Sequence, residues 1–381
     1  MKTFIIFLTF LFSTSLLAQN LSWSQLCKLD TRLESSSGLT SLNDGQTFWT
    51  HADNNSPAEI YEIDVNCNIL KILKITGVPK RDWEEITADT NGNLFLGDFG
   101  NNNNNRKDLQ IYILRNVEQL TTDSIIPEII QFTYGDQSAF PPNAATRNFD
   151  MEAMIWYHDS LHLFSKNRTD PFTGLTYQYR LPDQAGSYTL FPIDSFKTGN
   201  GPMLFYWVTA AAIQPLAKEL VLLSHDRMWF FDQFEGSQFF KGRVREIILP
   251  SYTQKEAVFA GSNAHWYFTD EYNNTIRLGG NLYKASLETS ALTDSEAQDK
   301  EMQIWPNPLR NSLEILLPHF KNTEFEQLDI LDIAGKCLIQ ITIDHAQMHI
   351  PLEGLSNGYY ILRKTSGKLK KQIFRYFCKT E

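Results

Sequence analysis

Residues 152–168 read EAMIWYHDSLHLFSKNR: a carboxylate, an apolar run, a His-Asp-Ser turn, a second run and a polar end. Four further stretches between Ser37 and Asn274 repeat this order with drift. They are SGLTSLNDGQTFWTHADNN at 37–55, EITADTNGNLFLGDFGNN at 85–102, AAAIQPLAKELVLLSHDR at 210–227 and EAVFAGSNAHWYFTDEYNN at 256–274. The five copies start roughly 45 to 70 residues apart, the spacing of four-stranded propeller blades. The repeat predicts an all-β chain folded as a β-propeller.

The second run of each copy alternates or is wholly apolar, as in LFLG at 94–97 and LVLL at 220–223, which is typical of strands buried between blades. Residues 19–289 are assigned to the propeller. We predict six blades, because the long gaps after the second and third copies leave room for a diverged one, while five or seven remain open. The strand around Leu21–Leu29 is expected to close the ring by pairing with the last blade.

The chain begins like an exported protein. Residues 1–18, MKTFIIFLTFLFSTSLLA, have one lysine, an apolar run and small residues before Gln19, as a secretory signal peptide does. We find no other stretch with the ~20 apolar residues that a membrane-spanning helix needs. The formal net charge of −10 disfavours nucleic acid as a partner.

Four cysteines remain after the signal: Cys27, Cys67, Cys337 and Cys378. Their spacing matches no zinc signature, and the pairing of cysteines cannot be deduced from sequence. A Cys27–Cys67 disulfide is one arrangement that an oxidising compartment would permit.

A second unit follows the propeller. Residues 290–301, SALTDSEAQDKE, are polar and acidic and read as a linker. In 302–381, short alternating runs such as LEILLP at 313–318 are separated by Asn-Pro, Ala-Gly-Lys and Asn-Gly turns. This pattern predicts a compact β-sandwich.

The tail resembles the type A C-terminal sorting domain of Bacteroidetes proteins exported by the type IX secretion system. The motifs that carry the resemblance are Pro306-Asn307-Pro308, Asp332-Ile333-Ala334-Gly335-Lys336, Leu355 with Gly358-Tyr359-Tyr360, and the terminal lysines. The chain departs from the pattern by continuing past the lysines to Glu381. The resemblance implies that residues 302–381 engage the type IX machinery, and that the protein is released or attached at the outer-membrane surface, usually after removal of the tail.

Carboxylates open the first run in three copies. In a propeller, equivalent positions of the inner strands surround the central axis, so Glu85, Glu152 and Glu256 are expected to converge. Converging carboxylates repel unless a cation or protons neutralise them, and calcium suits such oxygen ligands. We therefore predict a calcium site on these glutamates. The alternative is a solvated rim on which each glutamate pairs with a local lysine or arginine.

The polar ends of the copies should emerge together at one mouth of the propeller, because every blade runs in the same direction. Lysine and arginine side chains there could hold an anion, and histidine could move a proton. The alternative is that these residues only shape turns and balance charge. The candidate catalytic residues are His51, Asp98, Lys166, Arg168, His225 and Asp270.

Several established active-site motifs are missing from the sequence. There is no G-x-S-x-G elbow, no H-E-x-x-H helix and no P-loop. Trp83, within Asp82-Trp83-Glu84-Glu85, is interpreted as a blade-packing residue, with a sugar-stacking surface as the alternative.

A second resemblance spans residues 30–275. Ser37-Gly38-Leu39, Asp82-Trp83-Glu84-Glu85-Ile86, Asp150-x-Glu152-Ala153 and Phe164-Ser165-Lys166-Asn167-Arg168 are similar to secreted propellers of the SdiA-regulated and phytase-like (esterase-like) superfamily. That family implies six blades, calcium in some members, and phosphoester or lactone hydrolysis in a few. Gly38 and Ala211 stand where other copies carry glutamate, which weakens transfer of a multi-calcium mechanism.

The propeller fold by itself does not determine function. We predict a secreted or cell-surface protein that recognises an extracellular small molecule, glycan or protein. The alternative is a calcium-dependent hydrolase of phosphoesters or lactones, and a structural surface role also stays open.

Overall fold

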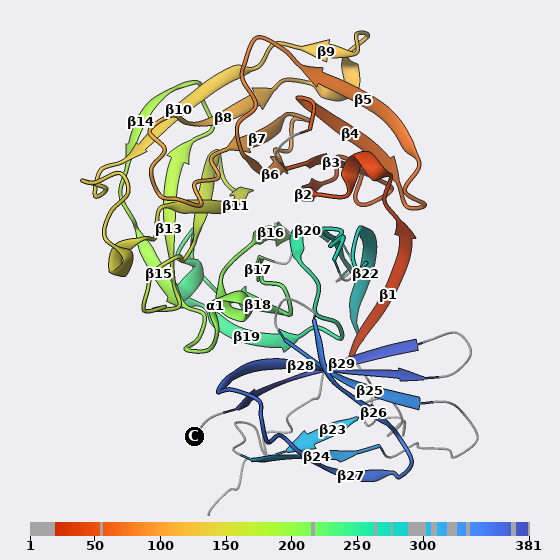
Figure 1. Cartoon of the computed structure of the whole chain (residues 1–381). Coiled ribbons are helices and arrows are strands. Elements are labelled where there is room, and N and C mark those ends of the chain that lie inside the picture. Colours follow the sequence, from red (N-terminus) through yellow and green to blue (C-terminus); the bar gives the residue numbers. More distant parts are fainter. Residues whose placement is uncertain are drawn as a thin grey trace, which may run out of the picture.

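The computed structural model of the protein describes residues 20–53, 56–214, 218–262, 265–275, 277–288, 302–305, 311–317, 326–332, 336–366 and 371–379 (Figure 1). The predicted signal peptide at 1–18 and linker at 290–301 lie outside these residues. Helices are short: η1 (Thr31–Leu33), η2 (Val117–Gln119), η3 (Ala144–Thr146), α1 (Met203–Tyr206) and η4 (Phe239–Lys241). Within the described residues, no helix is long and apolar enough to cross a membrane.

Five sheets form the propeller, not the six that we predicted. The inner strands contact one another in cyclic order, and the last returns to the first (Figure 1). They are β2 (Ser36–Thr40), β6 (Trp83–Ala88), β11 (Asp150–Trp156), β16 (Ala210–Gln214) and β20 (Lys255–Gly261). The long gaps in the repeat hold additional outer strands instead of a sixth blade. β9 (Ser124–Ile125) pairs in parallel with β5 (Ile69–Ile75), and β14 (Gly186–Leu190) pairs in parallel with β10 (Glu128–Tyr134).

Each blade contains four antiparallel strands, and β9 and β14 are fifth strands on blades 1 and 2. Blade 1 contains β2 (Ser36–Thr40), β3 (Thr47–Ala52), β4 (Glu59–Asp64) and β5 (Ile69–Ile75). Blade 2 contains β6 (Trp83–Ala88), β7 (Leu94–Asp98), β8 (Leu109–Leu114) and β10 (Glu128–Tyr134). Blade 3 contains β11 (Asp150–Trp156), β12 (Ser160–Lys166), β13 (Leu175–Pro182) and β15 (Asp194–Lys197). Blade 4 contains β16 (Ala210–Gln214), β17 (Glu219–Leu223), β18 (Arg227–Asp232) and β19 (Arg243–Ile248). Blade 5 contains β20 (Lys255–Gly261), β21 (His265–Asp270), β22 (Asn281–Glu288) and the N-terminal strand β1 (Asn20–Lys28).

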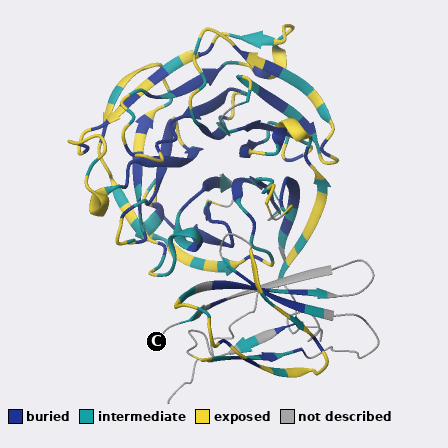
Figure 2. Ribbon diagram, in the orientation of Figure 1, coloured by how far each residue is buried: buried dark blue, intermediate teal, exposed yellow. Residues whose placement is uncertain are grey.

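Burial falls from the axis outward, as Figure 2 shows. All of β2 and β12 is buried, whereas most residues of the outer strand β19 are exposed or partly exposed. Neighbouring blades meet through large apolar side chains; Trp83, for example, is fully buried in one cluster with Trp49 and Tyr112. Trp83 therefore packs two blades together and is not a sugar-stacking surface.

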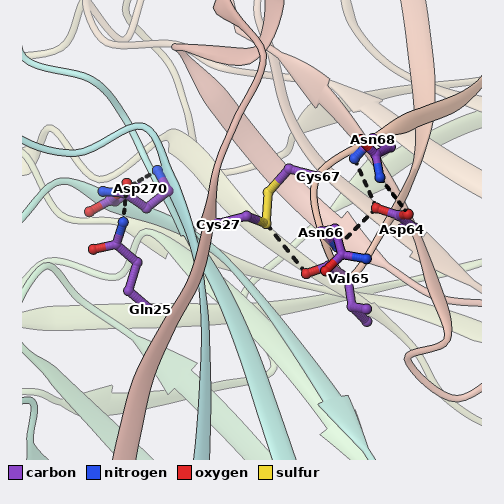
Figure 3. Close-up of a disulfide and its surroundings, with 9 residues drawn as sticks. Gln25, Cys27, Asp64, Val65, Asn66, Cys67, Asn68 and Asp270 are labelled. Atoms are coloured by element: carbon purple, nitrogen blue, oxygen red, sulfur yellow. Dashed lines mark hydrogen bonds between the residues drawn. A yellow bond between two sulfur atoms is a disulfide. The ribbon is translucent and has the colours of Figure 1, made fainter.

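Strand β1 closes the ring by pairing with β22, from Asn20 opposite Glu288 to Lys28 opposite Asn281. This closure confirms the expectation from sequence. Cys27 in β1 is joined by a disulfide to Cys67, in the turn between β4 and β5 of blade 1 (Figure 3). The disulfide links the strand that completes blade 5 to blade 1, across the closing seam.

The C-terminal unit consists of two sheets. One contains β23 (Gln303–Trp305), β24 (Ser312–Leu316) and β27 (Gln347–Pro351); the other contains β26 (Cys337–Thr342), β25 (Glu326–Leu331), β28 (Gly358–Ser366) and β29 (Lys371–Lys379). Leu313 and Ile350 of the first sheet share one buried cluster with Leu328, Leu362 and Phe377 of the second. Two sheets with a common core make the predicted β-sandwich. The motif residues 306–308 and 333–335 lie outside the described part of the chain.

Candidate functional site

The inner strands all begin at one mouth of the propeller, and four of them begin with a β-bulge. In each bulge one residue has no partner on the second strand, because the register shifts across it. The bulged residues are Gly38, Glu84, Glu152 and Glu256. β16 of blade 4 pairs regularly from Ala210 to Gln214. Glu84, not Glu85, is therefore the structural equivalent of Glu152 and Glu256.

Glu85 lies one residue further along β6, fully buried in the centre of the ring. Its Oε1 accepts from the Ile86 amide at 3.0 Å and its Oε2 from the Ala211 amide at 3.3 Å. The amides of Leu39 and Met154 also donate to it, so its donors come from four blades. Burial raises the pKa of the Glu85 carboxyl, and these four N–H groups oppose the rise. Glu85 is an anchor for the ring, and the predicted trio of metal ligands does not come together.

The other two predicted ligands share a lysine. The Lys166 ammonium lies 3.1 Å from Glu152 Oε1 and 3.8 Å from Glu256 Oε2, and all three side chains are at least nine-tenths buried. Glu152 and Glu256 raise the pKa of Lys166 above its usual range despite its burial. A protein cation therefore neutralises these two carboxylates, which is the local pairing considered as the alternative.

Arg168 and Trp207 extend this group. The guanidinium of Arg168 lies 2.6 Å from Asp150 Oδ2 and 3.5 Å from Glu152 Oε1. Lys166 and Arg168 both lie over the Trp207 ring, 4.7 and 4.9 Å from its centroid, at distances typical of cation–π contacts. Trp207 follows α1, and the repeat pattern does not mark it as a site residue.

His225 joins the same group through Glu256. Its Nε2 lies 3.1 Å from Glu256 Oε1 and its Nδ1 lies 3.3 Å from the Tyr252 hydroxyl. Burial would raise the pKa of Glu256, but Lys166 and His225 outweigh it and keep that pKa below its usual value. Lys166, Arg168 and His225 are thus the three predicted candidates that the fold brings together.

Asp98 and Asp270 have structural roles. Asp98 accepts from the amides of Arg81 and Asp82, each at 3.1 Å, and from the Tyr112 hydroxyl at 3.1 Å. Asp270 accepts from the Tyr283 hydroxyl at 2.8 Å. An aspartate–tyrosine hydrogen bond thus joins the second strand to the third within blade 2, and an equivalent bond does so within blade 5. The aspartates recur in the sequence because the blades recur.

His51 is also separate from the Lys166 group. It is fully buried, and burial together with the nearby Lys80 lowers its pKa to about 3. Its Nε2 has no hydrogen-bond partner among the described residues. A Cβ on residue 38 would come within 2.8 Å of this nitrogen and within 2.7 Å of the Ile86 backbone nitrogen. Gly38 also has a φ of +76°. A glutamate at position 38 would collide with His51, which explains why this bulge carries glycine.

Three carboxyl groups that we did not predict as a site meet beside blade 2. Ligand oxygens of Asp53, Asp82 and Glu84 all lie within 4.8 Å of one another. Gly100 packs directly against Asp82 and Glu84, so that a Cβ there would strike both carboxyl groups. Asp53 belongs to the polar end of the first copy, and Asp82 and Glu84 belong to the Asp82-Trp83-Glu84-Glu85 motif. Only the bulge shows that Glu84 faces the other two carboxyl groups.

The mouth has more carboxyl groups than basic groups, and repulsion among the carboxylates adds to burial in raising the pKa values of several of them. Burial, Asp53 and Asp150 raise the pKa of Asp82 to about 7, and burial, Glu152 and Asp53 raise that of Glu84 well above its usual value. Burial and Glu256 raise the pKa of Glu271 to about 8. The carboxyl groups are Asp53, Asp82, Glu84, Asp150, Glu152, Glu256 and Glu271, and the basic groups are Lys80, Arg106, Lys166 and Arg168.

In the presence of a chelator, the thermal midpoint is expected to fall as pH rises from about 6.5 to 7.5. In this window unfolded aspartates and glutamates have lost their protons, while native Asp82 and Glu271, with pKa values of about 7 and 8, still hold theirs in part. Each rise in pH therefore favours the unfolded state. His51 and His162, with pKa values of about 3, and Lys80 and Lys255, with pKa values of about 8, act in the opposite sense. The histidines do so mainly below about pH 6.5 and the lysines mainly above about pH 7.5. Calorimetry should show a flatter profile for the D82N/E271Q double variant, and an equal slope in both proteins would contradict the assignment.

The C-terminal tail matches a known domain family. Residues 303–375 match the model of the secretion system C-terminal sorting domain. The tail is a sorting domain. It directs export by the type IX secretion system, so the protein reaches the cell surface or is secreted. Sandwich strands β24, β25, β27 and β28 lie within the matched residues of the sorting domain.

The sequence matches none of the curated proteins. Among solved structures, a PQQ-bound aldose sugar dehydrogenase from Streptomyces coelicolor aligns at 11% identity and a TM-score of 0.43, over 71% of this chain and 99% of that one. PorZ, a surface component of the type IX secretion system of Porphyromonas gingivalis, aligns at 14% and 0.31, over 91% of this chain and 45% of that one. A gluconolactonase from Xanthomonas campestris aligns at 9% and 0.38, over 70% and 89%. The activity of the present chain has to be argued from its own residues.

Proposed function

We propose that this exported propeller binds calcium at Asp53, Asp82 and Glu84 and recognises an oxygen-rich extracellular ligand at the same mouth. The observation that carries the proposal is the meeting of three carboxyl groups whose ligand oxygens lie within 4.8 Å of one another. This set replaces the Glu85, Glu152 and Glu256 set expected from the repeat.

The residues fit a hard divalent cation. Calcium prefers carboxylate oxygens and accepts several of them in flexible geometry. Gly100 provides the space in which the Asp82 and Glu84 carboxyl groups sit, because any larger residue would fill it. Lys166 and Arg168 form their ion pairs with Glu152 and Asp150. Their charges also act on Glu84, however, and the nearby Lys80 acts on Asp53 and Asp82.

A calcium ion held there would offer open coordination positions to hydroxyl, carboxylate or phosphate oxygens of a ligand. The protein residues around it would orient that ligand. Trp207 presents a partly buried aromatic surface, and Arg168, 21% exposed, is the most accessible cation of the Lys166 group. Glycans and acidic small molecules combine the oxygen atoms and the carbon faces that such a mouth would bind.

Calcium-dependent hydrolysis of phosphoesters or lactones is the alternative function, and it needs a base able to accept a proton from water. His225 was one of the two histidine candidates for that base. Both of its ring nitrogens are engaged, one by Glu256 and the other by Tyr252. Recognition without turnover is therefore the function that this geometry supports better.

Thermal unfolding with calcium and with a chelator tests the proposed site. Calcium at about a hundred times its dissociation constant should add about 2.7 kcal/mol of stability, a rise of several degrees in midpoint. D82N and G100A should lose most of this rise, D82N by removing a charged ligand and G100A by crowding Asp82 and Glu84.

The matched control is E118Q, which removes one carboxylate from an exposed position on the same blade. It should respond to calcium like the unmodified protein. An equal calcium response in all four proteins would place the ion elsewhere, and no response in the unmodified protein would remove calcium from the proposal.

A further inference from the structure

The last blade of the ring depends on the first strand of the chain. Trp23 of β1 covers Phe268 and Tyr283 of blade 5, with ring centroids 5.2 and 5.0 Å apart. Without β1, blade 5 would end at β22, whose backbone N–H and C=O groups would lack partners on that edge. Its two aromatic rings would also lose their cover.

Covalent bonds tie β1 only to blade 1. The chain continues from Lys28 through residues 29–35 into β2, and the disulfide joins Cys27 to Cys67 of blade 1 (Figure 3). Hydrogen bonds and packing alone join β1 to blade 5, among them Gln25 Nε2 to Asn281 Oδ1 at 2.9 Å and Lys28 over the Tyr272 ring at 4.1 Å. A terminal strand held in this way tends to fray unless it is tied down.

We propose that the Cys27–Cys67 disulfide is a redox-controlled clasp that keeps the propeller ring closed. With the disulfide formed, β1 is fixed against blade 1 and loses little further freedom when it pairs with β22. With the thiols reduced, β1 regains that freedom and detaches from blade 5 more often, so the ring opens at the seam between blades 5 and 1.

The clasp makes ring closure depend on the compartment. The two thiols form the disulfide by exchange with a disulfide oxidant, which takes up two electrons and two protons and becomes a dithiol. Such oxidants act outside the cytoplasm, where the sorting domain sends this protein. The chain before export therefore has an untied N-terminal strand, and the exported chain has a closed ring.

Amide hydrogen exchange on the full exported protein tests the clasp. Reduction with dithiothreitol, or the C27S/C67S double substitution, should speed exchange in β1 and β22 by about tenfold or more, while exchange in β11 and β12 of blade 3 changes less than about twofold. The thermal midpoint should fall by roughly 5–10 °C, given a closed loop of 40 residues. Dithiothreitol should have no further effect on the double variant, which keeps the exposed Cys337 as an internal control.

Two results would overturn the clasp. One is unchanged exchange in β1 and β22 after reduction, which would mean that packing alone holds the strand. The other is equal acceleration in all five blades, which would mean that the disulfide stabilises the whole fold and does not govern opening at the seam.

Discussion

The E85A variant is expected to be less stable than the unmodified protein by at least about 3 kcal/mol, because a buried donor left without a partner costs about 1–3 kcal/mol. The carboxyl group of Glu85 accepts from amides of four blades, and alanine would leave Leu39, Ile86, Met154 and Ala211 without this acceptor. Urea unfolding followed by tryptophan fluorescence would measure the loss.

E85Q provides the graded comparison. Its amide oxygen can still accept from some of these four backbone amides. Its NH2 group, however, would face backbone N–H groups that also donate. Its stability should lie between those of E85A and the unmodified protein. E118A on the exposed surface of blade 2 should stay within about 0.5 kcal/mol, as surface substitutions usually do. An E85A variant as stable as E118A would show that Glu85 does not anchor the ring.

The propeller could be predicted from sequence because each blade repeats the same burial pattern. The linear sequence repeats an alternating second strand and a turn before it. In the third copy the turn residues are His158 and Asp159, and both have positive φ in the structure. The closing role of β1 follows from the need to cover a free edge. Local pattern and global fold agree in these elements, so the sequence is informative about them.

The blade number could not be predicted in the same way. β14 follows β13 of blade 3 in the chain but pairs with β10 of blade 2, and β9 lies between strands of blade 2 but pairs with β5 of blade 1. Each of these strands extends the preceding blade. A gap in a repeat gives the length of the inserted chain but not the sheet that receives it.

The site was predicted in part, and the errors come from the bulges. Matching the copies by their letters aligns Glu85 with Glu152, but β6 bulges at Glu84 and β11 bulges at Glu152, so Glu84 is the equivalent residue. A shift of one residue turns a side chain to the opposite face of a strand. This one-residue difference separates Glu84, a proposed calcium ligand, from Glu85, which anchors the ring, and the sequence contains no signal for it.

K166M is expected to cost about 3–5 kcal/mol, the usual effect of removing one partner from a buried ion pair. The ammonium of Lys166 lies between the Glu152 and Glu256 carboxylates, and methionine would fill similar space without the charge. The two carboxylates would then repel each other, so the loss should be larger at about pH 8 than at about pH 5, where more of them carry protons.

K241M is the matched control, because Lys241 pairs with Asp194 at 3.2 Å but is 64% exposed. Its cost should stay below about 1 kcal/mol, as for other surface pairs. Calcium should stabilise K166M more than the unmodified protein, since a divalent ion could then neutralise Glu152 and Glu256 as the lysine does. A K166M variant as stable as K241M at both pH values would show that these carboxylates need no cation. The charge of the mouth would then give no reason to expect calcium at Asp53, Asp82 and Glu84, and that site would rest on geometry alone.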